Sequence, residues 1–405
     1  MKRPHVPPLV RTLLAINLFN GVATGALALV LPLYAVSLGA SAGQVGLLGT
    51  VQWIGVLLVS VPAGAVVGMW GWGRLYGAGS AMQGILLLAL PLVGGPAALS
   101  PLAALASTGR TVGHVSVGST LLGELALLGD DKAGWHRASF SLGMTFLGPL
   151  IGGAALVTLG ARSTLVALGV AVLLVAAAAS RVADARRLAS VEDARAIMRR
   201  RLSDLRRLVR RPHLLRAFAI EGIVNAAMAV YATFAPLFVT RSLGGTSATI
   251  GVIAAGQGLC YVTMLLFGGP LLLRLGRAGQ YALGGVLSAA AFALLALASD
   301  VRVAAVASLV LGAGLAAISF ATFAILGAEP EDKGAVFGAF GLVMAAFVMF
   351  APLGAGVVGD VVGVRGVFAG GAPLFLGLSA YLLVAHLRSE RASTARVAVA
   401  ELPAE

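Results

Sequence analysis

Twelve apolar segments follow one another along the chain, and each is long enough to cross a lipid bilayer. A spanning helix needs about 20 apolar residues, and the segments cover 12–36, 43–67, 75–95, 98–128, 138–160, 163–182, 215–240, 247–273, 280–298, 302–327, 335–359 and 365–387. Because 59% of the 405 residues are hydrophobic and only 11% are charged, the chain could not present a wettable surface. We therefore predict an all-α membrane protein with twelve transmembrane helices.

The distribution of the positive charge indicates the orientation. The formal net charge is +13, and 24 of the 29 Lys and Arg residues lie on the side that both termini share. The opposite loops hold four, and Arg110 lies inside a segment. The positive-inside rule then predicts a multi-pass protein of the cell membrane with both termini in the cytoplasm.

One long polar stretch, residues 183–214, divides the chain into halves of similar size. We predict an N-terminal six-helix bundle at 1–182, a basic cytoplasmic linker at 183–214, a C-terminal six-helix bundle at 215–387 and a cytoplasmic tail at 388–405. Eleven Arg residues cluster between Arg186 and Arg216, while Leu202, Leu205, Leu208 and Val209 recur at helical spacing. This linker either lies along the inner leaflet, its arginines on anionic lipid headgroups, or is a solvated segment that only fixes topology. Aromatic residues are absent from it, which argues against nucleic-acid binding.

The second half of the chain repeats landmarks of the first half. A shift of 205 positions carries Gly39 to Gly244, Gly46 to Gly251, Gln52 to Gln257, Gly64 to Gly269 and Gly71 to Gly276. Pro32 similarly matches Pro236, and Asn17 matches Glu221. The repeat predicts two pseudo-symmetric bundles, an arrangement in which rocking one bundle against the other opens a central site to each side in turn.

The loop after the second segment, GAVVGMWGWGR at 64–74, resembles the Gly-x-Leu-x-Asp-x-x-Gly-Arg signature of the major facilitator superfamily. GGPLLLRLGR at 268–277 is similar, and the resemblance covers essentially the whole chain. It implies a transporter in which these loops take part in gating. The matching positions are Gly64, Gly71 and Arg74 in the first copy and Gly269, Arg274, Gly276 and Arg277 in the second.

Both copies lack the acidic residue of that signature, which in the family helps to latch the cytoplasmic gate. Gly68 and Leu273 stand in its place, so the latch must be weakened or made by other groups. Glu124, at the cytoplasmic end of the fourth segment, is our candidate substitute, facing Arg74 or Arg137. Alternatively, Glu124 is an interfacial residue solvated by headgroup water.

The fifth segment carries GPLIGG at 148–153, which resembles the signature of drug and metabolite antiporters within the superfamily. Gly148, Gly152 and Gly153 remove side chains so that a neighbouring helix can approach, and Pro149 removes a backbone donor and bends the helix. We expect a tight, kinked helix contact between the bundles. The resemblance favours an exporter, whereas a packing device alone is the other interpretation.

Charged residues inside the apolar segments need a reason, because insertion of one costs about 2.5 to 3.5 kcal/mol. Arg110, in the fourth segment, loosely resembles the family's cavity-lining Arg, which tunes proton transfer; here it could equally hold an anionic substrate. His114 follows one turn later on the same helix face and either carries a proton or is a buried neutral residue.

Glu221, in the seventh segment, is the deepest acidic residue. Burial disfavours the charged form of a carboxyl group, which is the property that a proton-coupled transporter needs. Glu221 is therefore a candidate proton carrier with Arg110 and His114, although it could instead form a structural ion pair with Arg216 or Arg110, or contact the substrate only. Uncharged candidates for substrate binding fall in the first, second, seventh and eighth segments: Asn17, Asn20, Gln52, Asn225, Tyr231 and Gln257.

Nothing in the sequence indicates an enzyme, a cofactor or a metal site. The chain lacks a Walker loop for ATP, and its one cysteine, Cys260, excludes an internal disulfide. The favoured function is export of a drug, siderophore or secreted metabolite by proton antiport, with a small-molecule substrate, protons and membrane lipids as partners of a monomer and no nucleic acid. The alternatives are a proton-coupled uptake symporter and a non-transporting sensor or scaffold on the same fold.

Overall fold

The computed structural model describes residues 6–128, 134–181, 210–327 and 333–400, together with 196, 199, 203 and 206–208. These residues form helices joined by short turns, and no strand occurs among them. The predicted all-α fold class is confirmed. Most of the predicted linker and the last residues of the tail lie outside the described residues.

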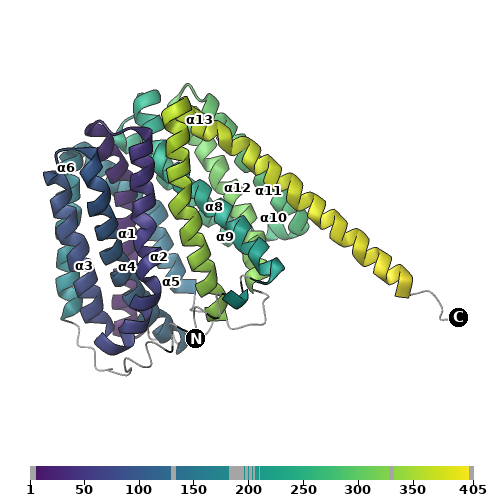
Figure 1. Ribbon diagram of the computed structural model, residues 1–405, viewed down its shortest axis with the longest axis horizontal. Helices are drawn as coiled ribbons and strands as arrows, with labels where there is room; N and C mark the ends of the chain where they lie inside the picture. The colour runs from purple at the N-terminus through teal and green to yellow at the C-terminus, as the bar shows by residue number, and fades with distance from the viewer. Residues whose placement is uncertain are drawn as a thin grey trace.

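The first half of the chain folds into one bundle of long helices (Figure 1). Its elements are α1 (Pro8–Ser37), α2 (Ala42–Trp70), α3 (Trp72–Ala89), the short η1 (Leu90–Leu92), α4 (Pro96–Ala126), α5 (Gly134–Ser141), η3 (Leu142–Leu147) and α6 (Gly148–Ser180). The segment η3 is π-helical and precedes Pro149. Proline has no N–H group and crowds the preceding turn, which is a physical reason for the irregular winding there.

The second half forms a matching bundle beside the first (Figure 1). Its elements are α8 (Pro212–Leu237), the π-helical η4 (Phe238–Ser242), α9 (Ser247–Phe267), α10 (Gly269–Arg274), α11 (Gly276–Leu297), α12 (Val301–Gly327) and α13 (Lys333–Ala400). Contacts between the bundles run mainly through α2 with α13 and α6 with α9.

The described part of the chain holds nine helical stretches that are long and apolar enough to cross a membrane. Two of them, at Trp135–Ser180 and Ala339–Ala385, have 46 and 47 residues, about twice the length of one pass. Each turns back where a glycine leaves the helical conformation, at Gly160 and Gly363. With α4 as a further span, the arrangement is consistent with twelve passes, and the chain is a multi-pass membrane protein.

The turns repeat the internal symmetry of the sequence. Positive φ angles occur, among the described residues, at six glycines that form three pairs: Gly39 and Gly244, Gly71 and Gly276, Gly160 and Gly363. Each pair occupies equivalent turns in the two halves. The first helix turn after Gly39 and Gly244 is also capped alike, by Ser41 on α2 and by Thr246 on α9. The duplicated landmarks therefore mark duplicated backbone geometry.

The end of the linker packs on the C-terminal bundle. Leu208 is fully buried in a cluster with Leu214, Phe218, Leu326 and Phe340. Burial in a protein cluster does not agree with either interpretation given above for the linker, contact with the inner leaflet or full solvation, at Leu208. A leucine that fills a protein cluster anchors the linker to α8 and α13 instead. Leu202, Leu205 and Val209 lie outside the described residues.

Candidate functional site

A cavity of about 160 Å³ lies between the two bundles. Its walls come from α1, α2, α4, η3 and α6 of the first bundle and from α8, α9 and α13 of the second. Five of the predicted site residues line it: Gln52, Arg110, Asn225, Tyr231 and Gln257. Pro149 of the fifth-segment signature lines it too. The repeat thus brings the paired glutamines, Gln52 and Gln257, to one cavity from opposite bundles.

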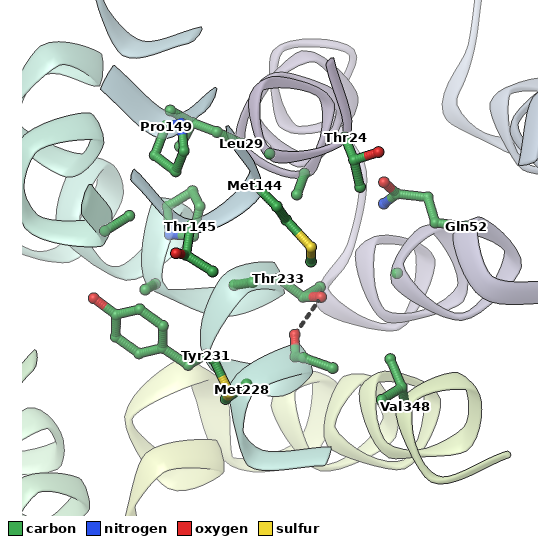
Figure 2. Close-up of a pocket in the computed structure, with 18 of the residues that line it drawn as sticks. Thr24, Leu29, Gln52, Met144, Thr145, Pro149, Met228, Tyr231, Thr233 and Val348 are labelled. Atoms are coloured by element: carbon green, nitrogen blue, oxygen red, sulfur yellow. Dashed lines mark hydrogen bonds between the residues drawn. The ribbon is translucent and has the colours of Figure 1, made fainter. Parts of the chain in front are cut away.

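Figure 2 shows labelled side chains of both halves around this space. Thr24 and Gln52 approach from one side, and Met228, Tyr231 and Thr233 of α8 approach from the other (Figure 2). The Tyr231 hydroxyl donates to Ser308 Oγ at 2.8 Å, which ties the ring to α12. Gln257 is only 6% exposed, and its Nε2 atom has no hydrogen-bond partner among the residues that the structure describes. Most of the other lining residues are small or apolar.

Arg110 brings a positive charge to the cavity wall. Its Nη2 atom donates to the backbone oxygen of Gln52, and its guanidinium carbon lies 5.7 Å from the centre of the Trp53 ring. Ser107 Oγ donates to the same Gln52 oxygen at 2.8 Å, so two hydrogen bonds hold α4 to α2 beside the cavity. The expected alternative, an ion pair between Arg110 and Glu221, is not formed.

Glu221 lies behind the cavity wall in α8 and is fully buried. Its Oε1 atom accepts hydrogen bonds from Ser319 Oγ at 2.8 Å and from Asn225 Nδ2 at 3.2 Å. Tyr261 OH donates to Ser319 Oγ at 3.1 Å, so a hydrogen-bonded chain links α9, α12 and α8. No described residue donates a hydrogen bond to the Oε2 atom. Glu221 has hydrogen bonds and no ion pair within the described residues, so neither Arg216 nor Arg110 is its partner.

His114, Asn17 and Asn20 lie in a second polar cluster inside the N-terminal bundle and do not line the cavity. Asn17 Nδ2 donates to the His136 backbone oxygen at 2.7 Å and to Ser139 Oγ at 2.9 Å. Asn20 accepts from Tyr76 OH at 3.0 Å. The His114 ring lies 4.5 Å from the Phe140 ring and 6.2 Å from the His136 ring.

Within the described part of the chain, several polar atoms of this second cluster have no hydrogen-bond partner. They are Asn17 Oδ1, Asn20 Nδ2, His114 Nδ1 and His136 Nε2. Buried polar atoms without partners are costly, and such a group is a natural place for ordered water. For Asn17 and Asn20 the geometry supports a bundle-internal role rather than direct contact with a substrate in the cavity.

The glycines of the GPLIGG signature divide between two neighbours. A Cβ atom added at Gly148 would lie 2.8 Å from Gly25 Cα, and one added at Gly152 would lie 3.0 Å from Ala26 Cα, both in α1 of the same bundle. At Gly153 it would lie 2.9 Å from Gly251 Cα in the other bundle. The expectation that all three glycines lie between the bundles was therefore wrong for Gly148 and Gly152.

The Gly153 contact has a symmetric counterpart. A Cβ atom added at Gly356 of α13 would lie 3.1 Å from Gly46 Cα of α2. Gly356 and Gly46 occupy the positions that correspond to Gly153 and Gly251 in the repeat. The bundles thus meet, at the end remote from the N-terminus, through two equivalent glycine pairs that allow backbones to touch.

A polar contact across the bundles lies at the same end. The Asp360 carboxylate of α13 accepts from Gly43 N at 3.0 Å and from Ser41 Oγ at 3.3 Å, at the N-terminus of α2. Negative charge is favoured at a helix N-terminus, where backbone N–H groups are unpaired. Arg241 of η4 adds a bond to the Val36 oxygen of α1 at 3.1 Å.

The loop signatures lie at the other end of the bundles. Gly71 ends α2 and Gly276 begins α11, each with a positive φ angle, so both serve as turn residues. Gly64 and Gly269 are half-buried, while Arg74, Arg274 and Arg277 are exposed. Glu124 is half-buried near the end of α4. Arg137, one of the two residues that Glu124 is predicted to face, places its guanidinium carbon 4.5 Å from the Phe323 ring of α12, in the opposite bundle.

Sequence reasoning missed Trp53, Ser319, His136 and Asp360. Trp53 carried a usable signal, because it follows Gln52 directly and so sits beside a predicted cavity residue. Ser319 and His136 carried none, because their importance arises from contacts between helices far apart in the chain.

Comparisons with known proteins agree with this architecture. The sequence profile of the Major Facilitator Superfamily matches residues 217–403, the second bundle and the tail. No curated protein sequence matches the chain. The chain has the fold of the major facilitator superfamily. The predicted resemblance is confirmed at the level of the fold, while its efflux antiporter branch stays a prediction.

Solved transporters share the major facilitator fold along nearly their whole length. The nucleoside transporter NupG superposes with a TM-score of 0.70 at 15% identity, covering 93% of this chain and 99% of that chain. A peptide transporter, POT, gives 0.75 at 15% identity, with 94% of each chain covered. The human organic anion transporter MFSD10 (TETRAN) gives 0.60 at 18% identity, covering 93% and 100%. At these identities the likeness establishes the fold alone.

Proposed function

We propose that this chain is a secondary active transporter that moves a small molecule across the cell membrane by alternating access. The observation that carries the proposal is the cavity between two pseudo-symmetric bundles, lined by both of them. The glycine pairs at one end let the bundles touch without interlocked side chains, which suits a contact that must open. No ATP-binding loop, enzyme site or cofactor is part of this proposal.

Proton coupling is the second part of the proposal. A charged carboxylate that forms no ion pair is costly in an apolar interior, so a buried acid such as Glu221 suits proton uptake and release. Asn225 joins Glu221 to the cavity, because it bonds to Glu221 and lines the cavity as well. Arg110 and His114 remain candidates for tuning the proton site, with His114 acting from the second polar cluster.

The direction of transport rests on the fifth-segment signature, which favours export. Uptake by proton symport is the second candidate, since the same cavity and the same acid serve either direction. A sensor or scaffold is disfavoured because it need not bear the insertion cost of Arg110 and Glu221.

A single cysteine at Thr233, in a Cys260→Ala background, tests alternating access without any substrate. Thr233 lines the cavity, and a transporter that alternates exposes it to each side in turn. We expect an impermeant maleimide to label it from the outer face in intact cells. The same reagent should label it from the cytoplasmic face in everted vesicles, which turn that face outward. Labelling from one side only would show a fixed state and favour the sensor or scaffold.

Everted vesicles then test direction and coupling. With a proton gradient in place and a panel of small molecules supplied, export by antiport predicts that the substrate enters the vesicles and dissipates the gradient. A substrate that leaves the vesicles together with protons would identify a symporter.

The predicted orientation has its own test. Cysteines at Ser190 and Ser299, in the Cys260→Ala background, lie in loops expected on opposite sides of the membrane. We expect an impermeant reagent to label only the Ser299 position in intact cells, because Ser299 is exposed at the end remote from the N-terminus. Labelling at Ser190 would overturn cytoplasmic termini.

Asp360→Asn should loosen the end of the bundles remote from the N-terminus. A carboxylate at a helix N-terminus contributes about 0.3 to 1 kcal/mol, so removal of the charge should raise the open population about two- to fivefold. Labelling of the Thr233 cysteine from outside should accelerate by that factor. Asp300→Asn is the matched control, because Asp300 is an exposed acid that bonds within its own bundle, to Arg302 N. An unchanged rate in Asp360→Asn would remove Asp360 from the gate.

A further inference from the structure

The cavity between the bundles has a one-sided charge. Arg110 lines it, and no acidic side chain does so within the part of the chain that the structure describes. Desolvating a guanidinium without a counter-ion is costly. A carboxylate ligand would offset that cost, whereas an ammonium ligand would add a second unpaired positive charge. The cavity is therefore matched to an anion and poorly matched to a cation.

Arg110 is held in place by contacts that leave donors for a ligand: one hydrogen bond to a described residue is found. One N–H group bonds to the Gln52 backbone oxygen, and the guanidinium plane lies near the Trp53 ring. A guanidinium has five N–H donors in a fixed fork, which matches the two oxygens of a carboxylate. Because its partner is a backbone oxygen and not an acid, a ligand carboxylate need not displace an ion pair to bind.

The remainder of the cavity suits an apolar body. Its walls include Leu29, Met144, Met228, Ile250 and Val348, drawn from both bundles. Methionine side chains adapt to ligands of varied shape. The unpartnered Nε2 atom of Gln257 supplies an unmet donor on the wall that belongs to the second bundle. A ligand that reaches both Arg110 and the α8–α9 wall would contact both moving parts.

The volume indicates the size of ligand that the cavity suits in this conformation. An engineered apolar cavity of about 150 Å³ holds benzene, and the cavity here is about 160 Å³. We propose that the substrate is a small organic monoanion, with one carboxylate bound by Arg110 beside Trp53 and an apolar body about the size of one aromatic ring. This inference rests on the proposed transport function. A siderophore or a large cationic drug does not fit this description.

Thermal unfolding of the purified protein in phosphatidylcholine nanodiscs tests the substrate class. The probes are benzoate and phenylacetate, their neutral analogue benzamide and the cation benzylammonium. A ligand that binds only the folded protein raises Tm in a saturable way. We expect the two carboxylates to raise Tm and the other two compounds to leave it unchanged. Equal stabilisation by benzamide or benzylammonium, or no stabilisation by either carboxylate, would overturn the proposal.

Variants then locate the site. Arg110→Gln should weaken carboxylate binding at least tenfold, and Arg110→Lys should restore part of it, because an ammonium keeps the charge without the fork. Arg302→Gln is the control, since Arg302 is an exposed Arg outside the cavity. If Arg110→Gln fails to fold, comparison of the anionic, neutral and cationic probes on the native protein still tests the substrate class. Unchanged affinity in a folded Arg110→Gln protein would place the anion elsewhere. The accessibility experiment at Thr233 uses no ligand, so failure here leaves the transport proposal standing.

Discussion

Glu221→Gln is expected to abolish uphill transport while exchange of substrate across the membrane continues. Glutamine keeps the size of the side chain and can still accept from Ser319, but it cannot bind and release a proton. Gradient-driven accumulation needs net proton movement, whereas exchange at equal concentrations does not. Accumulation in everted vesicles should fall to the level of vesicles without the protein, and counterflow should remain.

Ser319→Ala is the matched control for this effect. It removes the hydrogen bond to Glu221 Oε1 and leaves the acid in place, so coupling should survive with a displaced pH profile. A Glu221→Gln protein that still concentrates substrate with an unchanged pH profile would make Glu221 a structural residue. His114 or Glu124 would then be the next candidate for the coupling group.

Gly153→Leu is expected to abolish transport while the protein still folds and inserts. The new side chain would collide with α9 at Gly251, because even a Cβ atom would lie 2.9 Å from Gly251 Cα and 2.9 Å from the Ser247 oxygen. The bundles could then not close at the end remote from the N-terminus. The labelling rate of the Thr233 cysteine should rise in intact cells, where the reagent reaches the outer face. It should fall to background in everted vesicles, where the reagent reaches the cytoplasmic face.

Two further leucine variants separate this gate effect from general packing. Gly354→Leu should be silent, since a Cβ atom at Gly354 meets nothing within 4 Å. Gly152→Leu should overpack α1 near Ala26 inside one bundle, which costs about 1 to 3 kcal/mol of stability. Normal transport by Gly153→Leu would show that close approach of α6 and α9 is not required.

The sequence predicted what depends on composition and repetition. Long apolar runs require helices, because lipid offers no partners to backbone groups. The equivalent glycines of the repeat mark equivalent turns, such as Gly39 and Gly244. Residues on cavity-facing helices, such as Gln52 and Gln257, could also be predicted from the sequence. Polar side chains in apolar helices need water or a hydrogen-bond partner, and a central cavity offers both.

The sequence could not predict which neighbour each small residue meets. Gly152 and Gly153 are adjacent, yet they face different bundles, because one residue turns an α-helix by about 100°. The π-helical segment just before them changes the helix phase further, and a period of 3.6 residues does not anticipate it. The sequence also could not predict that Ser319 donates a hydrogen bond to Glu221, since the two residues lie 98 positions apart.

The paired glycine contacts have a consequence for the temperature response of the protein. When Gly153 leaves Gly251 and Gly356 leaves Gly46, the surfaces that separate at these two contacts are largely backbone. Apolar exposure raises heat capacity by about 0.45 cal/mol/K per Å² and polar exposure lowers it. Separation of the glycine pairs themselves should therefore contribute a heat-capacity change close to zero. Curvature in a plot of the logarithm of the ratio of open to closed molecules against reciprocal temperature should then report the apolar side chains around these pairs, and not the glycine contacts.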